Sequence, residues 1–173
     1  MAVASTASSL QALQPAYPPP KQGKIRWGQL YGSAAEALIA QTASEFKGLV
    51  LLVTSDTHQA YRMEASLRFF APELPVHIFP DWETLPYDIF SPHEDIISER
   101  LKILARLPTL QQGILIVPVA TLMQRLAPTN YVQGHSLWLK AGMKLEIDSF
   151  RKHLDKAGYQ NVSQVMQHGE YAT

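Results

Sequence analysis

Strongly apolar runs alternate with amphipathic segments along residues 25–126, which predicts strands and helices in turn. Residues 48–54 and 113–117 are nearly continuous apolar runs, as in strands that are buried on both faces of a parallel sheet. A shorter run at 76–79 predicts a third strand. Residues 25–31 predict a weaker fourth strand, which is placed mainly by the helix expected after it.

Three amphipathic helices are expected between these strands, each with its apolar residues on one face. The expected buried stripes are Ala35, Leu38, Ile39, Thr42 and Phe46; Ala60, Met63, Leu67 and Phe70; and Ile97, Leu101 and Leu104. Asp56 is the expected N-cap of the second helix and Ser91 that of the third, where Pro92 and Glu94 suit the first turn. A fourth, short helix is expected over 119–126. This alternation predicts an α/β fold, a three-layer domain with a mainly parallel sheet.

The pattern changes on both sides of this domain. Residues 1–23 are rich in Ala, Ser, Gln and Pro, so we expect a flexible tail there. The elements expected after Pro128 are short strands at 136–140 and 144–147, a helix capped by Asp148, and a strand at 168–171. The resulting interpretation is a tail (1–23), an α/β domain (24–127) and the beginning of a small α+β domain (128–173) that is truncated.

Charge and composition narrow the possible classes of function. Lysine and arginine (15) balance aspartate and glutamate (15), whereas a chain that holds DNA by its phosphates usually carries a basic excess. We therefore do not expect this chain to be the main DNA contact. The absence of cysteine excludes disulfides and thiolate metal sites, and a reducing compartment is expected. No apolar run approaches the length of about 18 residues that a membrane span needs, so no membrane contact is expected.

The turn before the first helix is where a phosphate loop would lie, and such a loop needs glycine amides, a lysine and a hydroxyl. The turn consists of Gly32, Ser33, Ala34 and Ala35. No lysine follows it until Lys47, and Glu36 would add negative charge beside any bound phosphate. We therefore predict a degenerate loop that binds no cofactor. The alternative is a small nucleotide-dependent enzyme that uses the Gly32 turn, because a helix N-terminus attracts anions.

A second candidate is the acidic and aromatic segment DWETLPYD at 81–88, which follows a strand where α/β folds place their sites. Its residues of interest are Asp81, Trp82, Glu83, Leu85, Pro86, Tyr87 and Asp88. The carboxylates would suit a metal or acid–base site. We favour the other interpretation, in which Trp82, Leu85 and Tyr87 pack over the sheet edge, because no basic partner lies in the segment. Elsewhere the histidines lack metal-ligand spacing and no nucleophile motif occurs, so neither a catalytic nor a metal site is expected.

Four segments together carry a resemblance to a known family. They are DWETLPYD (81–88), SPHEDIISERL (91–101), GILIVPVATLMQRL (113–126) and AGYQNVSQVMQHGEYAT (157–173). In this order they resemble the N-terminal region of the bacterial transcription-repair coupling factors, the Mfd family, a region that is itself similar to the first two domains of the repair protein UvrB. The resemblance covers about residues 25–173, and the first two segments in close succession are its specific part.

The resemblance implies a UvrB-like α/β domain with a degenerate phosphate loop, followed by the domain through which UvrB and these factors bind UvrA. No catalysis is expected in this chain. In the complete factor, ATP, Mg²⁺, RNA polymerase and DNA would be bound by regions beyond Thr173, in the bacterial cytoplasm. His168 and Glu170 are the candidates for the rim of the UvrA contact. Besides the nucleotide-dependent enzyme, one more alternative remains. The resemblance implies that the complete factor is a DNA translocase, and this chain would then be a purely structural domain that holds the translocase in a resting state.

Overall fold

The computed structural model describes residues 23–24, 26–85, 88–136 and 139–173, and these residues form two compact units. The first unit contains the described residues up to Asp81 together with Thr109–Gln124. The second unit contains the described residues of Trp82–Pro108 and Arg125–Thr173. The sequence pattern assigns 82–108 to the α/β domain, whereas in the structure this segment groups with the residues that follow Gln124.

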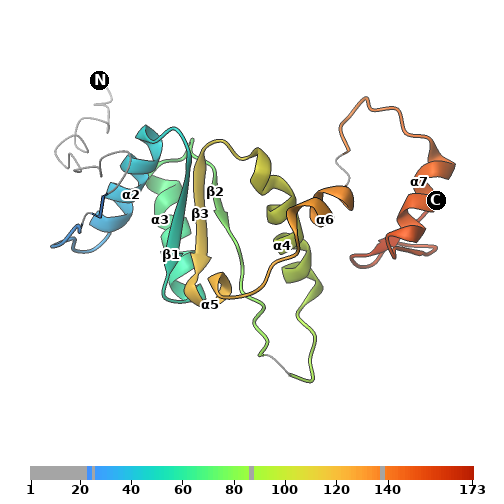
Figure 1. Cartoon of the computed structure of the whole chain (residues 1–173), viewed down its shortest axis with the longest axis horizontal. Coiled ribbons are helices and arrows are strands. Elements are labelled where there is room, and N and C mark those ends of the chain that lie inside the picture. Colours follow the sequence, from blue (N-terminus) through green and yellow to red (C-terminus); the bar gives the residue numbers. More distant parts are fainter. Residues whose placement is uncertain (1–22, 25, 86–87, 137–138) are drawn as a thin grey trace, which may run out of the picture. The chain divides into compact units, whose positions relative to one another are not determined.

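A three-stranded parallel sheet is the centre of the first unit (Figure 1). Its strands are β1 (Leu49–Thr54), β2 (Val76–Ile78) and β3 (Gly113–Pro118), in the order β1-β3-β2. All six residues of β3 are buried, and this central strand has a neighbour on each side. The apolar runs therefore predict the three strands correctly, and the expected α/β class with a parallel sheet is confirmed.

Two helices, α2 (Ala34–Glu45) and α3 (Thr57–Phe70), pack on one face of this sheet (Figure 1). The core between them consists of Ala40, Ala43, Ala60, Met63, Leu67, Ala71, Val76, Ile78, Ile114 and Ile116. The strand residues in this set alternate with residues on the opposite face, as the pleat of a strand requires. On β1 the opposite face carries Leu51 and Val53, which are half exposed. A short helix, α5 (Val119–Leu122), follows β3 and ends earlier than the sequence suggests.

Two expectations for the first unit are wrong. Residues 26–31 form no strand, and Gln29 has a φ of 59°, which interrupts an extended backbone; Ile25 lies outside the described residues. The expected stripe of α2 is right for Leu38, which is buried, and for Ile39, which packs against the core, but it is wrong for Phe46, which is 54% exposed. The buried residues of this helix are Glu36, Ala37, Leu38, Ala40 and Ala43. Alanines form this face because their small side chains let the helix approach its neighbours closely.

The N-cap of α3 gives a testable pH dependence. Asp56 accepts a hydrogen bond of 2.7 Å from the amide of Gln59, and this bond, with a further one from Ser55, holds the pKa of Asp56 below its ordinary value of 3.8. Because the folded state binds the proton less tightly than the unfolded state, the stabilisation is present above pH 3.8 and is lost as the pH falls through the folded pKa. Asp56→Ala should lower the Tm at pH 7. The difference from the original chain should shrink below pH 3.8, in thermal melts recorded from neutral to strongly acidic pH with Asp88→Ala as the control.

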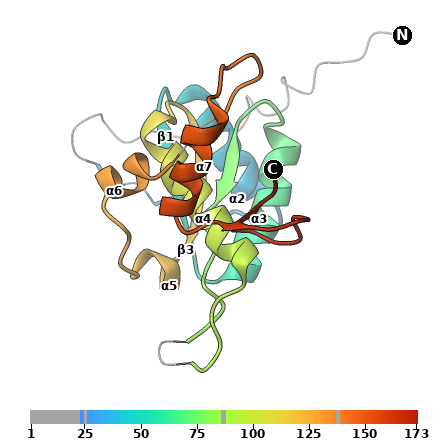
Figure 2. The ribbon, with the colours of Figure 1, turned by 90° about the vertical axis from the view of Figure 1, so that its right-hand side faces the viewer.

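The longest regular elements of the second unit are helices (Figure 2). Its elements are α4 (Glu94–Arg106), a 3₁₀ turn (Leu107–Thr109) whose last residue belongs to the first unit, α6 (Thr129–Gly134), α7 (Ile147–Lys156), β4 (Gln160–Asn161) and β5 (Glu170–Tyr171). α4 packs against α6, and β4 pairs with β5 in parallel. The hydroxyl of Tyr171, a buried residue, donates a hydrogen bond of 2.6 Å to Asp155 at the end of α7. The small strand pair is thereby tied to the helix before it.

Several local expectations for the second unit are also wrong. The cap of α4 is His93 rather than Ser91, and the cap of α7 is Glu146 rather than Asp148, which instead lies within the first turn. Neither 136–140 nor 144–147 forms a strand in its described residues, and Ile147 already begins α7. The unexpected helix α6 begins directly after Pro128, whose fixed φ suits a helix start. Leu101 of α4 is half exposed, while Arg100 beside it is buried.

Candidate functional site

The carboxyl ends of the three parallel strands define the edge of the sheet at which α/β folds bind ligands. The side-chain amide of Gln112, just before β3, lies 3.5 Å from the carbonyl oxygens of Ser44 and Phe46, at the end of α2. The C-terminus of α2 therefore lies at the edge where β3 begins. From there α2 runs back toward the carboxyl edge of the sheet (Figure 1).

The turn that leads into α2 has the backbone of a tight helix entry but no side-chain cap. Gly32 has a φ of 58°, and Ser33 occupies the N-cap position without a side-chain hydrogen bond. The amide of Ala37 donates to the carbonyl of Ser33 at 3.0 Å. Glu36, in the first turn, is only 8% exposed, and its Oε2 has no hydrogen-bond partner among the described residues. A largely buried carboxylate thus lies directly after the turn that corresponds to a phosphate loop.

Asp81 links the ends of two strands at the same edge. Its Oδ1 accepts hydrogen bonds from the hydroxyl of Thr121, at 3.0 Å, and from the side-chain amide of Gln124, at 2.7 Å. Thr121 is 1% exposed, so its hydroxyl cannot turn to solvent. The first acidic residue of the DWETLPYD segment therefore fixes the segment that follows β3 to the segment that follows β2.

Among the other described residues of the DWETLPYD segment, some pack against neighbours and others are exposed to solvent. In the second unit the guanidinium of Arg100 lies 4.0 Å from the centre of the Trp82 ring, a cation–π contact that accompanies the burial of Arg100. Leu85 is 78% exposed, so the expectation that it packs is wrong. Glu83 and Asp88 are exposed. Pro86 and Tyr87 lie outside the described residues, and no arrangement of the segment as a metal or acid–base site follows from the others.

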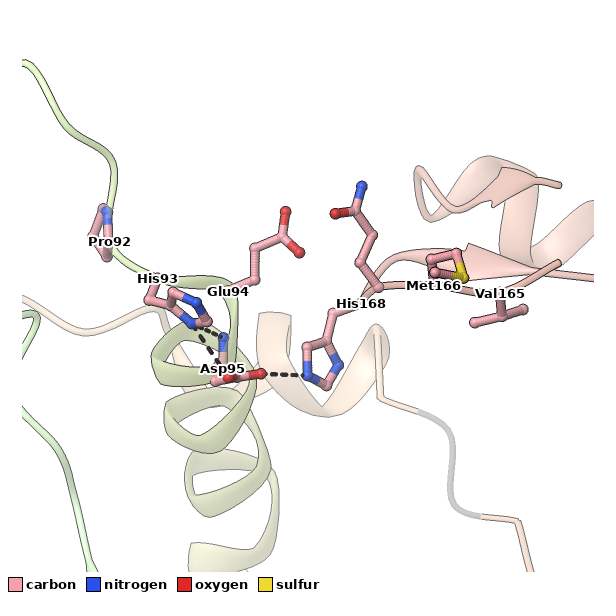
Figure 3. A pocket seen from close by; sticks show the side chains of 8 residues that line it. Pro92, His93, Glu94, Asp95, Val165, Met166 and His168 are labelled. Atoms are coloured by element: carbon pink, nitrogen blue, oxygen red, sulfur yellow. Dashed lines mark hydrogen bonds and ion pairs between the residues drawn. The ribbon is translucent and has the colours of Figure 1, made fainter.

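A shallow hollow of about 660 Å³ in the second unit brings together two of the segments that carry the resemblance (Figure 3). Asp95, in the first turn of α4, lies between two histidines: its Oδ1 is 2.9 Å from Nε2 of His168, and its Oδ2 is 3.3 Å from Nδ1 of His93. Glu170 turns inward, since its carboxylate accepts from the amides of Met166 (2.8 Å) and Gln167 (3.2 Å).

The two expected contact residues thus have different positions. His168 is on the wall of the hollow, paired with Asp95, whereas Glu170 shapes the turn before β5. Sequence reasoning does not single out Asp95, Arg100 or Thr121. The available signal for Asp95 is an acidic residue in a first helical turn, which is common; Arg100 and Thr121 give no signal, because their partners are distant in the chain.

The described part of the chain was searched for a metal site and for a membrane-spanning helix. There, no group of three or more histidine, aspartate or glutamate side chains is arranged to hold a metal ion. No helix in the same part is long and apolar enough to cross a membrane. In the first unit, Asp81 is held by the hydrogen bonds from Thr121 and Gln124, and the first turn of α2 contains the buried Glu36.

Comparison with known proteins shows which family this chain resembles. The chain is 49% identical over 156 residues to the transcription-repair-coupling factor of Escherichia coli and 45% identical over 153 residues to that of Haemophilus influenzae. These matches cover 90% and 88% of the chain but only 14% and 13% of the relatives. The factor of Staphylococcus aureus is 27% identical over 140 residues. No protein-family model matches the chain. The chain is thus homologous to one segment of the transcription-repair-coupling factors, and the family expected from its motifs is confirmed.

Proposed function

We propose that this chain is a docking module that recruits UvrA to RNA polymerase stalled at DNA damage, within nucleotide excision repair, and that it performs no catalysis itself. The observation that carries the proposal is the 49% identity to the Escherichia coli factor over 90% of the chain. Binding of RNA polymerase and DNA, and ATP-driven translocation with Mg²⁺, would belong to the remaining length of such a factor.

The arrangement at the sheet edge favours docking over nucleotide chemistry. Phosphoryl chemistry requires cations that neutralise the phosphates, and the first turn of α2 offers Glu36 in their place. The nearest lysine along the sequence after this turn is Lys47, beyond the far end of α2. These features support a binding role and weigh against the small nucleotide-dependent enzyme.

The second unit offers a surface suited to a protein partner. Met166 is 78% exposed and Val165 is 50% exposed, and both line the hollow beside His168. Exposed apolar side chains surrounded by polar groups are typical of protein contacts. We infer that the turn at 165–168 contacts UvrA directly, and that Glu170 acts by holding the amides of this turn in place.

The proposal is tested by titrating purified UvrA onto the immobilised chain. Met166→Ser removes an exposed apolar contact and should weaken binding about tenfold, the effect typical of an interface anchor. Glu170→Ala should weaken it similarly because the turn loses two hydrogen bonds. Lys152→Ala, on the exposed side of α7, is the matched control and should bind UvrA as the original chain does. Circular dichroism verifies that each variant is folded.

Two results would contradict the proposal. Absence of UvrA binding both by the folded chain and by a longer segment of such a factor that contains it would remove the docking role from it. Binding that is unchanged in both variants would place the contact elsewhere, and the first unit would then be the place to search.

A further inference from the structure

Asp95 and His168 join two segments of the second unit that lie far apart in the sequence (Figure 3). Asp95 is in the first turn of α4, and His168 is the last residue of the turn at 165–168. The Nε2 atom of His168 lies 2.9 Å from Oδ1 of Asp95, across 73 positions of the chain. The helix dipole accounts for an aspartate at the start of α4 but not for its contact with His168.

Stability is not a sufficient reason for this contact. The side chains of His168 and Asp95 are 57% and 71% exposed. Water screens a pair that is as exposed as this, so such a pair adds little to the stability of a fold. The turn is also closed without His168, because Glu170 accepts hydrogen bonds from the amides of Met166 and Gln167. The contact therefore bears on the orientation of the His168 ring more than on the stability of the turn.

The chemistry of the pair decides which nitrogen of the imidazole ring carries a hydrogen. An ionised carboxylate only accepts hydrogen bonds, so the hydrogen between the two side chains is on Nε2 of His168. In the neutral imidazole Nδ1 then has no hydrogen and is an acceptor. Among the residues that the structure describes, none donates a hydrogen bond to this Nδ1. His168 thus has an acceptor available for a group from outside the chain.

His93, the other histidine beside Asp95, does not compete for this carboxylate. Its Nδ1 accepts the backbone amide of Asp95 at 3.2 Å and so forms the N-cap of α4. A ring nitrogen that accepts this bond carries no hydrogen, so its distance of 3.3 Å from Oδ2 of Asp95 is not a hydrogen bond. Of the two histidines, it is therefore His168 that donates to Asp95.

We propose that Asp95 is a positioning residue for UvrA docking, which holds the ring of His168 so that Nδ1 accepts a hydrogen bond from a donor group of UvrA. This inference rests on the docking function proposed above and names the chemistry of one of its contacts. The two nitrogens of an imidazole point in different directions, so a ring held through Nε2 presents Nδ1 away from Asp95 (Figure 3). Met166, which is 78% exposed, lines the same hollow. The turn thereby offers an apolar contact and a directed acceptor side by side.

The test is a titration of purified UvrA onto the immobilised chain and its variants. His168→Ala should weaken binding about tenfold and Asp95→Ala about fivefold, as for the loss of one hydrogen bond at an interface. Because Asp95 acts through His168, the double variant should bind no more weakly than His168→Ala alone. Asp95→Asn keeps an acceptor oxygen for Nε2 and should restore binding to within about twofold of the original chain. Glu99→Ala removes another exposed carboxylate of α4, which pairs with Lys102, and is the matched control that should bind as the original chain does.

A spectroscopic readout does not depend on UvrA. Under alkaline conditions, where histidine side chains are neutral, nuclear magnetic resonance of the ring nitrogens reports which of them carries the hydrogen. In the original chain the hydrogen of His168 should be on Nε2 alone, whereas in Asp95→Ala it should be shared between Nε2 and Nδ1. The Tm values of the two proteins should agree within about 3 °C, because the pair is exposed.

Three results would overturn the inference. The hydrogen of His168 could have the same distribution with and without Asp95, the losses of affinity could add in the double variant, or Asp95→Ala could bind UvrA as well as Glu99→Ala does. A different result would separate this inference from the docking function. If the ring is held as expected but neither this chain nor a longer segment of such a factor binds UvrA, the docking function and the partner named here both fail, whereas the role of Asp95 in orienting His168 stands.

Discussion

Replacing Gly113 by alanine should lower the free energy of unfolding of the first unit by about 2–5 kcal/mol, from backbone strain and overpacking together. Gly113 has a φ of 134°, a conformation that side chains oppose, and an added Cβ would lie 2.6 Å from the carbonyl oxygen of Pro75. That oxygen cannot move away easily, because it accepts a hydrogen bond of 2.8 Å from the amide of Ile114. The clash would therefore disturb the start of β3, the central strand.

The measurement is denaturant unfolding followed by circular dichroism, with Gly28→Ala as the control. Gly28 lies in the same unit, has no atom within 4 Å of an added Cβ and has no positive φ, so its substitution should change stability by less than about 0.5 kcal/mol. Equal midpoints for the two variants would show that β3 begins with a different backbone conformation.

Asp81→Ala should lower the free energy of unfolding by about 2–4 kcal/mol, because two hydrogen-bond donors lose their acceptor. Each buried donor left without an acceptor costs about 1–3 kcal/mol. The hydroxyl of Thr121 is the more costly of the two, since that residue is 1% exposed. Asp81→Asn should cost less than Asp81→Ala because an amide oxygen can still accept one of the bonds. Thermal and denaturant unfolding measure both variants.

A double-mutant cycle isolates this link from other effects of Asp81. In the Thr121→Val background Asp81→Ala should be less destabilising, by about 0.5–3 kcal/mol, because the hydroxyl that would be stranded is already absent. Asp88→Ala, in the same acidic segment but exposed, should stay within about 0.5 kcal/mol of the original chain. Additive costs for Asp81 and Thr121 would mean that their hydrogen bond contributes nothing.

Features of the fold with a local cause could be predicted from the sequence. β1 and β3 are continuous apolar runs, and Asp56 caps α3 through its own neighbours in the chain. The buried face of α2 could not be predicted in the same way, because a preference for large apolar residues overlooks a face of alanines. For the 25–31 segment the apolar pattern is misleading, since the backbone at Gln29 leaves the extended region.

The residues of the candidate site show the same difference between local and distant causes. The missing lysine and the acidic Glu36 can be recognised in the sequence before α2. The burial of Glu36 depends on packing around the helix, and the bond between Asp81 and Thr121 joins residues that are 40 positions apart. The pairing of Asp95 with His168 spans 73 positions. No local pattern encodes such contacts, so sequence reasoning identifies the segments but not the partners.

The strand order β1-β3-β2 has a consequence for biosynthesis. β1 and β2 do not pair with each other. Both pair with β3, which is the last of the three strands to be synthesised by the ribosome. At about 5–20 residues per second, β1 waits several seconds in the nascent chain before its partner exists. The helix α3 needs only local contacts and can form during this interval, but the backbone of Leu49–Thr54 stays unpaired. Chaperones therefore have their greatest opportunity to bind this protein while the ribosome is translating the codons between Thr54 and Pro118.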